Sequence, residues 1–323
     1  MSPTATGVPV IDISGLRGAG RSEIVGALAR AHRTVGFSQI LGHGIPGEAL
    51  DVLFDASRTF QALPLKERRQ LALDHLHRGF IEIDTSVDRH SSIETATRPN
   101  QSESFMVMRE AGPGDPEVVA GTLLAGPNQW PDLPGFRAAV EHYQRCVEAV
   151  ATDVLAALAE GLGDDGALLN AFDRPTTWLR LLHYPPVAPN APGDLYGSAP
   201  HVDYGGVTLL THDGTPGLEV LIDGRWTAVE PVEGAIVVNC GQMLERASNG
   251  RLLPTAHRVH NRGGTERWSA AFFLDPHVDT VIAPVPCCVD ETDPPRFEPV
   301  VFGDVVRAEL GASFELHAGL IER

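Results

Sequence analysis

The chain lacks the sequence features of membrane, secreted and nucleic-acid-binding proteins. No stretch approaches the ~20 apolar residues that a membrane-spanning helix needs, and no basic segment followed by an apolar one marks a signal peptide. Basic residues are scarce, 25 against 42 acidic ones, and the net charge of −17 disfavours nucleic acid and anionic membranes as partners. The four cysteines lack the spacing of a disulfide framework, which indicates free thiols in a reducing compartment. We expect a cytoplasmic protein, with a monomer favoured.

The length and composition suit a large folded core. A chain of 323 residues with 43% hydrophobic and 21% charged residues can form one elaborate domain or two closely packed ones. We predict a helical and irregular N-terminal region over residues 1–130. Residues 131–323 are expected to hold a long helix and a β core at about residues 175–285, and both regions to form one integrated unit.

The hydrophobic periodicity changes after residue 175. Residues 135–162 carry apolar side chains at helical spacing and predict the longest helix. After residue 175, about eight short apolar runs are separated by turns, including a hairpin turn at Asp223-Gly224. This pattern predicts a mainly β fold with helices, in which a double-stranded β-helix (jelly roll) core is flanked by N-terminal helices. Residues 64–130 are expected to be irregular, and the segment 75–110, with His90, to line the entrance of a cavity.

A His-x-Asp triplet, His201-Val202-Asp203, is the strongest functional signal in the chain. Residues i and i+2 of an extended strand point to the same side, so both side chains can bind one ion. His257 follows Asp203 by 54 residues, far enough to return on a neighbouring strand as a third ligand. Two imidazoles and one carboxylate on one side of a metal are the ligand set of non-haem Fe(II) oxygenases.

A second triplet of this kind, His277-Val278-Asp279, has His317 downstream of it. Several prolines interrupt the path between the triplet and His317, and no arginine followed two residues later by serine lies near it. The first triplet is followed by Arg267 and Ser269 at the start of a buried-strand run. Their side chains point to the same side of the strand, where the guanidinium of Arg267 and the hydroxyl of Ser269 can bind a carboxylate together. We therefore predict the metal site at the first triplet.

A resemblance to a known family rests on these motifs and on their order. The segments HVDYGGVTLL, PGLEVL, GAIVVNCG, AHRV and RWSAAFF resemble the isopenicillin N synthase-like family of 2-oxoglutarate- and Fe(II)-dependent dioxygenases. The N-terminal segments VPVIDISGL, GFSQILGHGIP and GPNQWPDLPGF extend the resemblance over nearly the whole chain. The motifs are highly specific in combination.

The resemblance implies a jelly-roll enzyme that hydroxylates, desaturates or cyclises a small-molecule metabolite, with release of succinate and CO2. The implied cofactors are Fe(II), 2-oxoglutarate as cosubstrate and O2, with ascorbate as an accessory reductant. It assigns the catalytic iron ligands as His201, Asp203 and His257, and the 2-oxoglutarate-binding residues as Arg267, Ser269 and Tyr184.

The chain departs from the family pattern at four positions close to these motifs. Leu182 stands where many relatives have asparagine, Gln242 where aspartate is common, Ala247 where tryptophan is common, and His212 where glutamine or another polar residue is frequent. None of the four is an iron ligand in the resemblance. The departures bear on contacts to the substrate and cosubstrate rather than on the reaction.

Residues that contact the substrate are marked less clearly. Arg180 lies four residues before Tyr184, so strand alternation places both side chains on the same inward face. There Arg180 either binds an anionic group of the substrate, such as a carboxylate, or forms an internal ion pair. Tyr204, beside Asp203, and Phe105 are further candidates for the substrate pocket, although core packing is the favoured role of Phe105.

Two alternative functions remain at this point. The first is an Fe(II) oxidase of the same fold that does not use 2-oxoglutarate, which CO2 release from labelled 2-oxoglutarate would distinguish. The second is a non-catalytic jelly-roll protein that binds a structural Zn²⁺. A complete carboxylate clamp, formed by Arg267 and Ser269 beside the metal, argues against this second alternative.

Overall fold

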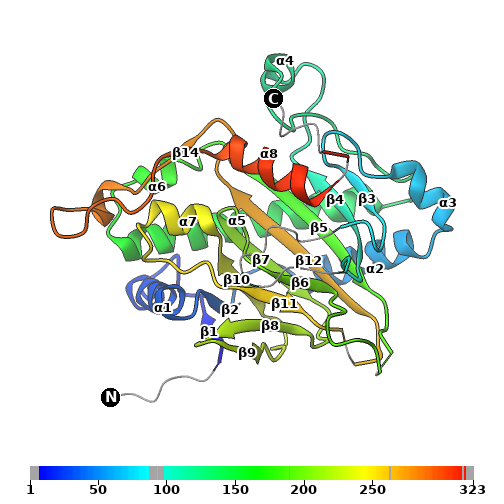
Figure 1. Ribbon diagram of the computed structural model, residues 1–323, viewed down its shortest axis with the longest axis horizontal. Helices are drawn as coiled ribbons and strands as arrows, with labels where there is room; N and C mark the ends of the chain where they lie inside the picture. The colour runs from blue at the N-terminus through cyan, green and yellow to red at the C-terminus, as the bar shows by residue number, and fades with distance from the viewer. Residues whose placement is uncertain are drawn as a thin grey trace.

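The molecule is built around two β-sheets (Figure 1). The computed structural model describes residues 7–86, 93, 98–188, 190–261, 263–314 and 316–317. The strands of the major sheet are β1 (Val10–Asp12), β2 (Phe37–Leu41), β3 (Gly79–Ile81), β4 (Glu103–Met108), β5 (Thr176–Tyr184), β7 (Val207–His212), β10 (Ile236–Cys240) and β12 (Arg267–Asp275). They lie in the order β1-β2-β10-β7-β12-β5-β4-β3.

The minor sheet supplies the second wall of the jelly roll. Its strands are β6 (Ser198–His201), β8 (Leu218–Ile222), β9 (Arg225–Ala228) and β11 (His257–Val259). They lie in the order β6-β11-β8-β9, and a separate pair joins β13 (Val281–Ile282) to β14 (Val300–Val301). The hairpin between β8 and β9 turns at Asp223 and Gly224, whose φ angles of 49° and 73° fit a type I′ turn.

Helices α1 (Arg21–Thr34), α2 (Gly47–Gln61) and α5 (Phe136–Leu162) cover the outer face of the major sheet. The other helices of the described residues are α3 (Leu65–Arg68), α4 (Pro116–Ala120), α6 (Ala167–Asn170), α7 (Gln242–Ala247) and α8 (Phe302–Ser313), with short 3-10 turns η1 (Arg69–Leu71) and η2 (Pro286–Cys288). The predicted long helix is α5, which packs on β7 and β12 with α1 and α2 beside it. It ends at Gly163, whose φ of 79° is the left-handed conformation that favours glycine at a helix end.

Strand alternation gives the major sheet two different faces. On β5, Leu179 and Leu181 belong to the core shared with α5, whereas Leu182 and Tyr184 pack between the two sheets. The inner face of β12 is aligned with that of β5, because Tyr184 is opposite Arg267 and Leu182 is opposite Ser269. The predicted jelly-roll core is confirmed, and the inward-facing residues of β5 and β12 lie between its sheets.

Two regions differ from the sequence-based expectation. Residues 64–130 are not wholly irregular, since β3 and β4 extend the major sheet beyond β5. All six residues of β4 are buried, so the strand has no polar alternation to mark it. The C-terminal helix α8, which the sequence analysis did not predict, crosses the top of the molecule in Figure 1.

The described part of the chain has no helix that is both long and apolar enough to cross a membrane. All four cysteines lie within it, and all four are free thiols. The sulfur atoms of the adjacent Cys287 and Cys288 are 3.7 Å apart.

Candidate metal and cosubstrate site

The structure brings the three predicted metal ligands together at one end of the minor sheet. His201 at the end of β6 and His257 at the start of β11 are direct partners in the strand register. One oxygen of Asp203, Oδ1, lies 3.6 Å from Nε2 of each imidazole. One ligand atom from each residue lies within 4.8 Å of the others, which is compact enough for all three to bind one ion.

Hydrogen bonds within each strand orient both imidazoles. His201 Nδ1 lies 2.8 Å from the carbonyl oxygen of Ala199, and His257 Nδ1 lies 3.2 Å from that of Thr255. A carbonyl only accepts, so each Nδ1 carries the proton and each Nε2 presents its lone pair to the ion. The two rings are 4.3 Å apart between centroids.

Asp203 is held as a carboxylate with one oxygen left for the metal. Its Oδ2 accepts hydrogen bonds from Thr208 Oγ1 at 2.6 Å and from Asn239 Nδ2 at 2.7 Å. Burial alone would raise the pKa of Asp203, but His257, His201 and Thr208 outweigh it and hold that pKa below its usual value. These contacts leave Oδ1 directed at the two imidazoles.

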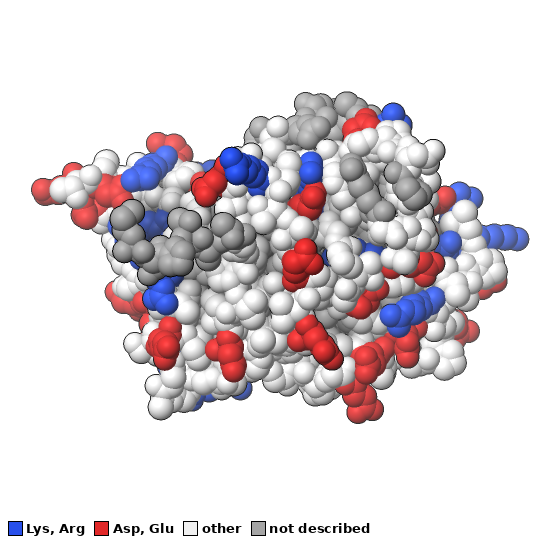
Figure 2. Space-filling model, turned by 90° about the horizontal axis from the view of Figure 1, so that it is seen from below, with Lys and Arg blue, Asp and Glu red and all other residues white. Residues whose placement is uncertain are grey.

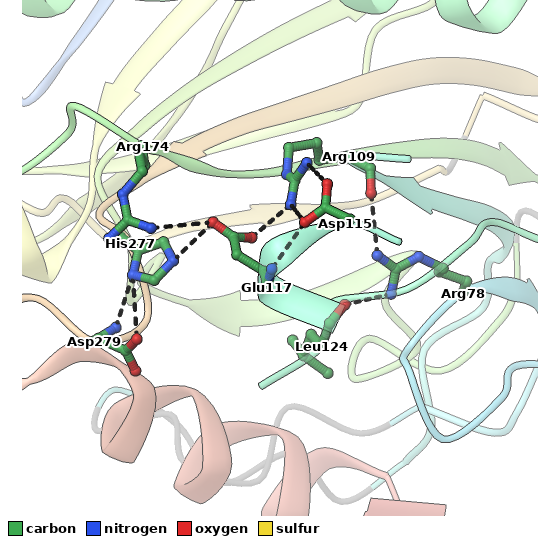
Figure 3. A network of polar contacts seen from close by, with 8 residues as sticks. All are labelled: Arg78, Arg109, Asp115, Glu117, Leu124, Arg174, His277 and Asp279. Atoms are coloured by element: carbon green, nitrogen blue, oxygen red, sulfur yellow. Dashed lines mark hydrogen bonds and ion pairs between the residues drawn. The ribbon is translucent and has the colours of Figure 1, made fainter. Parts of the chain in front are cut away.

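The rival triplet does not form a metal site. His277 Nε2 lies 3.2 Å from Glu117, and its Nδ1 accepts from the backbone N–H of Asp279 (Figure 3). Glu117 also pairs with Arg109 and Arg174, so this carboxylate is neutralised by its neighbours. Within the described ranges, the group formed by His201, Asp203 and His257 is the one cluster of three or more candidate ligands close enough to share an ion.

The predicted carboxylate clamp lies on the inner face of β12. Arg267 is 1% exposed, and its Nη1 donates to Ser269 Oγ at 3.2 Å. The guanidinium lies 4.8 Å over the ring of Tyr184, which is also its partner in the strand register. Arg267 Nε is buried and has no hydrogen-bond partner. An unpartnered buried guanidinium N–H is costly, and a bound carboxylate would satisfy it.

A second unpartnered group next to the clamp comes from His212, whose role the sequence did not reveal. His212 is directly opposite Ser269, and its Nδ1 accepts from Gly214 N at 3.1 Å. Burial, together with the charge of Arg267, lowers the pKa of His212, so the ring is neutral and its proton is on Nε2. This Nε2 is buried without a hydrogen-bond partner. The nearest sequence signal was the departure from the family pattern at this position.

A cavity of about 170 Å³ opens beside the metal ligands. Arg180 and Tyr204 both line it, as predicted, and so do His201 and Asp203. Arg180 is on the inner face of β5, and its Nε donates to Ser104 Oγ at 2.9 Å.

The structure places Phe105 in the core, the role favoured for it, and not in the substrate pocket. Its side chain is 1% exposed and points to the opposite face of β4, where its ring lies 4.7 Å from Phe60 and 5.4 Å from Phe136. Its neighbour Met106 lines the cavity instead. The error in the pocket assignment was one of register, because adjacent strand residues point to opposite faces.

The segment 75–110 contributes to the cavity wall, although His90 lies outside the described residues. His77, Ser86 and Asn100 from this segment line the cavity together with Met106. The C-terminal part of the chain adds Leu310 of α8 and the following Phe314 to the wall.

Comparisons with known proteins agree with this arrangement. Residues 175–276 match the model of the 2OG-Fe(II) oxygenase superfamily, and residues 8–133 match that of the N-terminal region of non-haem dioxygenases in morphine synthesis. A 2-oxoglutarate-Fe(II) type oxidoreductase of Emericella nidulans is 34% identical, over 97% of this chain and 92% of its own.

Solved structures agree as well. A full-length Neurospora crassa protein in complex with alpha-KG and thymine is 25% identical with a TM-score of 0.82, covering 96% of this chain and 98% of that one. The rice dioxygenase for auxin oxidation is 26% identical with a TM-score of 0.75, covering 98% and 99%.

Proposed function

Because this chain belongs to the 2OG-Fe(II) oxygenase superfamily, we propose that His201, Asp203 and His257 bind its Fe(II) and that Arg267, Ser269 and Tyr184 bind its 2-oxoglutarate. The protein is a 2-oxoglutarate-dependent Fe(II) dioxygenase that acts on a small molecule. The observation that carries the residue assignment is the convergence of two imidazole Nε2 atoms on one carboxylate oxygen, 3.6 Å from each.

The residues present fit both groups chemically. Two neutral imidazoles and one carboxylate are the facial ligand set of Fe(II) oxygenases. The buried, unpartnered N–H groups of Arg267 and His212 fit the negative charge of 2-oxoglutarate. When bound, Fe(II) and 2-oxoglutarate supply the oxidising chemistry, in which O2 oxidises the substrate while 2-oxoglutarate is converted to succinate and CO2.

The protein's own residues orient the reactants and exclude water. The backbone carbonyls of Ala199 and Thr255 fix the imidazole tautomers, and Thr208 and Asn239 hold the carboxylate of Asp203. Arg267 and Ser269 give the distal carboxylate of 2-oxoglutarate a charge-assisted anchor. Such rigid positioning lowers the barrier to reaction, because the entropy of aligning the reactants is already lost when they bind.

The substrate is proposed to enter the cavity between β5, β12 and α8. Arg180 is four residues, or ~13 Å along a strand, from Tyr184 of the clamp, too far to share the distal carboxylate of one 2-oxoglutarate. We assign its guanidinium to an anionic group of the substrate, and Tyr204 to the cavity wall. The relatives' ligands, such as thymine for the Neurospora protein, support a small molecule of this size.

The location and assembly of the protein stay predictions. The net charge of −17 supports a small-molecule substrate over nucleic acid or an anionic membrane. A cytoplasmic location and a monomer are proposed with it.

The residue assignment is tested by His201→Ala and Asp203→Ala in the full chain. Removing one of three ligands should abolish tight Fe(II) binding, measured under anaerobic conditions by equilibrium dialysis, and with it substrate-dependent CO2 release from labelled 2-oxoglutarate. The exposed His142→Ala is the matched control and should behave as the wild type. Near wild-type iron affinity and turnover in either ligand variant would refute the assignment. CO2 release by the wild type also excludes the oxidase alternative that does not use 2-oxoglutarate.

A further inference from the structure

One polar side chain of the substrate cavity has no role in the iron or 2-oxoglutarate sites. His77 is 2% exposed and lines the cavity with Trp178 and Phe314. Its ring meets both aromatic rings edge-on, at 5.6 Å from Trp178 and 4.9 Å from Phe314. Its Nδ1 lies 3.0 Å from Nε2 of His317, and its own Nε2 has no hydrogen-bond partner among the residues that the structure describes. A ring nitrogen without a partner on a residue that lines a cavity is available to a ligand.

His77 is held in this position by an unfavourable backbone conformation. Its φ of 61° is in the left-handed region, which non-glycine residues seldom adopt. The turn is fixed by Asp74, whose Oδ1 accepts from the N–H groups of Leu76 and Arg78. The buried guanidinium of Arg78 is bound in turn to backbone carbonyls, including that of Leu124 (Figure 3). Strained residues held this firmly are concentrated at ligand sites.

The contact with His317 bears on which ring nitrogen of His77 carries a hydrogen. Burial, with the charges of His317 and Arg180, holds the pKa of His77 well below 6.5, so its ring is neutral. Burial also lowers the pKa of His317, but by less, and Asp74 opposes that shift. The contact between Nδ1 of His77 and Nε2 of His317 takes one proton, and in the tautomer in which His317 carries it, His317 donates Nε2–H to Nδ1 of His77. A neutral imidazole has one proton, which then resides on Nε2 of His77 as a donor into the cavity.

We propose that His77, oriented by His317, is a substrate-recognition residue that donates Nε2–H to the carboxylate of a small ring-containing acid, whose same carboxylate binds Arg180. This inference rests on the role proposed for Arg180 above. The two residues lie at one end of the cavity, since His77 contacts Trp178, two positions before Arg180 on the inner face of β5. The wall also holds apolar side chains that suit a flat ring, together with polar ones that include Asn100, Gln242 and Glu309. The apolar ones are Met106, Trp178, Phe273, Leu310 and Phe314.

The test is isothermal titration calorimetry of the full chain saturated with Mn(II) and 2-oxoglutarate, using benzoate and its neutral analogue benzamide as probes. The wild type should bind benzoate more tightly than benzamide. His77→Phe keeps a ring beside Trp178 but removes the donor. Hydrogen bonds to charged acceptors are worth more than those to neutral ones, so this change should lower the benzoate preference about five- to tenfold. His77→Gln restores an N–H and should recover part of it.

Further variants separate orientation from bulk. His317→Gln keeps a donor to Nδ1 of His77 and should retain the benzoate preference, whereas His317→Phe should lower it. The exposed His142→Phe is the matched control and should leave it unchanged. Binding of Mn(II) and 2-oxoglutarate in the same samples reports whether each variant is folded.

The outcomes distinguish this inference from the proposed function. A wild-type preference in both His77→Phe and His77→Gln overturns the role of His77. If Arg180→Gln alone lowers the preference, the assignment of Arg180 stands and that of His77 fails. If Arg180→Gln has no effect, the proposed substrate anchor is wrong as well. A wild type that does not bind benzoate, or does not prefer it to benzamide, overturns the substrate class.

Discussion

Arg267 and His212 share an unusual condition, because each has a buried N–H that no protein group accepts. They lie at the same end of the inner sheet face, where His212 is opposite Ser269 and the charge of Arg267 lowers the pKa of His212. Two unpaired donors side by side cost several kcal/mol in the empty protein. A dicarboxylate that accepts from both would recover this free energy, and we therefore infer that His212 adds a donor to the proposed clamp.

The clamp prediction compares two single variants. Arg267→Ala removes a charged donor and should weaken 2-oxoglutarate binding about a hundredfold, whereas His212→Leu removes a neutral donor and should weaken it about tenfold or less. Both affinities can be measured by calorimetry on the Mn(II)-loaded protein. Arg137→Ala, at a half-exposed site on α5, serves as the control. A wild-type affinity in either clamp variant would show that the residue does not contact the cosubstrate.

Among single residues, the convergence of the candidate metal ligands was predictable and the cavity residues only partly so. His201 and Asp203 stand in a local motif whose strand geometry places both side chains on one side, and His257 is the register partner of His201 on β11. His77 has no such mark, because its role depends on contact with His317, 240 residues away in the chain. The sequence positions of Phe105 and Met106 are equivalent until the register with β5 is known.

Among the elements, the turn between β6 and β7 connects the metal site to the end of β12. Asp275 accepts from Gly206 N at 2.7 Å and from Trp178 Nε1 at 2.8 Å, so one carboxylate ties this turn to the cavity wall. A Cβ on Gly205 would lie 1.9 Å from Asp275 Oδ1, in a side chain that both hydrogen bonds hold in place. The glycine is required by close approach rather than by its φ angle.

Gly205→Ala should therefore disturb the site as well as the fold. The overlap must move either Asp275 or the turn that carries Asp203, and overpacking of this kind costs about 1–3 kcal/mol. We expect a lower melting temperature and weaker Mn(II) binding, measured by calorimetry. Gly112→Ala, where a Cβ would meet nothing within 4 Å, is the matched control. A Gly205→Ala protein with unchanged metal affinity would show that the turn tolerates the shift.

The elements that the sequence analysis missed were those without a pattern of their own. The strand β12 was recognisable from a continuous apolar run that begins at Arg267, and α5 from its helical stripe. By contrast, β3 has three residues and β4 is buried along its whole length, so neither alternates in polarity. Their place in the sheet is determined by pairing with β5, a long-range contact that local propensity does not encode.

For the molecule as a whole, the acidic charge is carried on the surface. Figure 2 shows the face seen from below, over which acidic side chains are spread with basic ones among them. By contrast, His32 is a titratable group at the centre of the fold. It is fully buried between α1 and the major sheet, with Nε2 at 3.1 Å from Ser38 and Nδ1 at 3.3 Å from Cys240.

This histidine predicts how global stability depends on pH. Burial lowers the pKa of His32 from 6.5 to about 4, so between these values the unfolded chain binds a proton that the folded chain does not. Its contribution is complete above pH 6.5 and is lost as the pH falls through about 4, amounting to about 3 kcal/mol. Urea unfolding of the wild type and His32→Gln at pH 7.5 and 4.5 measures this difference.

The variant should be less sensitive to acid than the wild type, even if it is less stable at neutral pH. His142→Gln, at an exposed position on α5, should keep the wild-type dependence. An equal change in the free energy of unfolding between the two pH values in the wild type and in His32→Gln would mean that His32 takes up its proton as readily in the folded protein as in the unfolded chain.

The most direct test of the central claim is a crystal structure of the protein with Mn(II) and 2-oxoglutarate, with the metal located by anomalous diffraction. We predict one metal bound by His201 Nε2, Asp203 Oδ1 and His257 Nε2, and the distal carboxylate of 2-oxoglutarate on Arg267 and Ser269. A metal bound elsewhere, or a cosubstrate whose distal carboxylate does not reach Arg267, would contradict it.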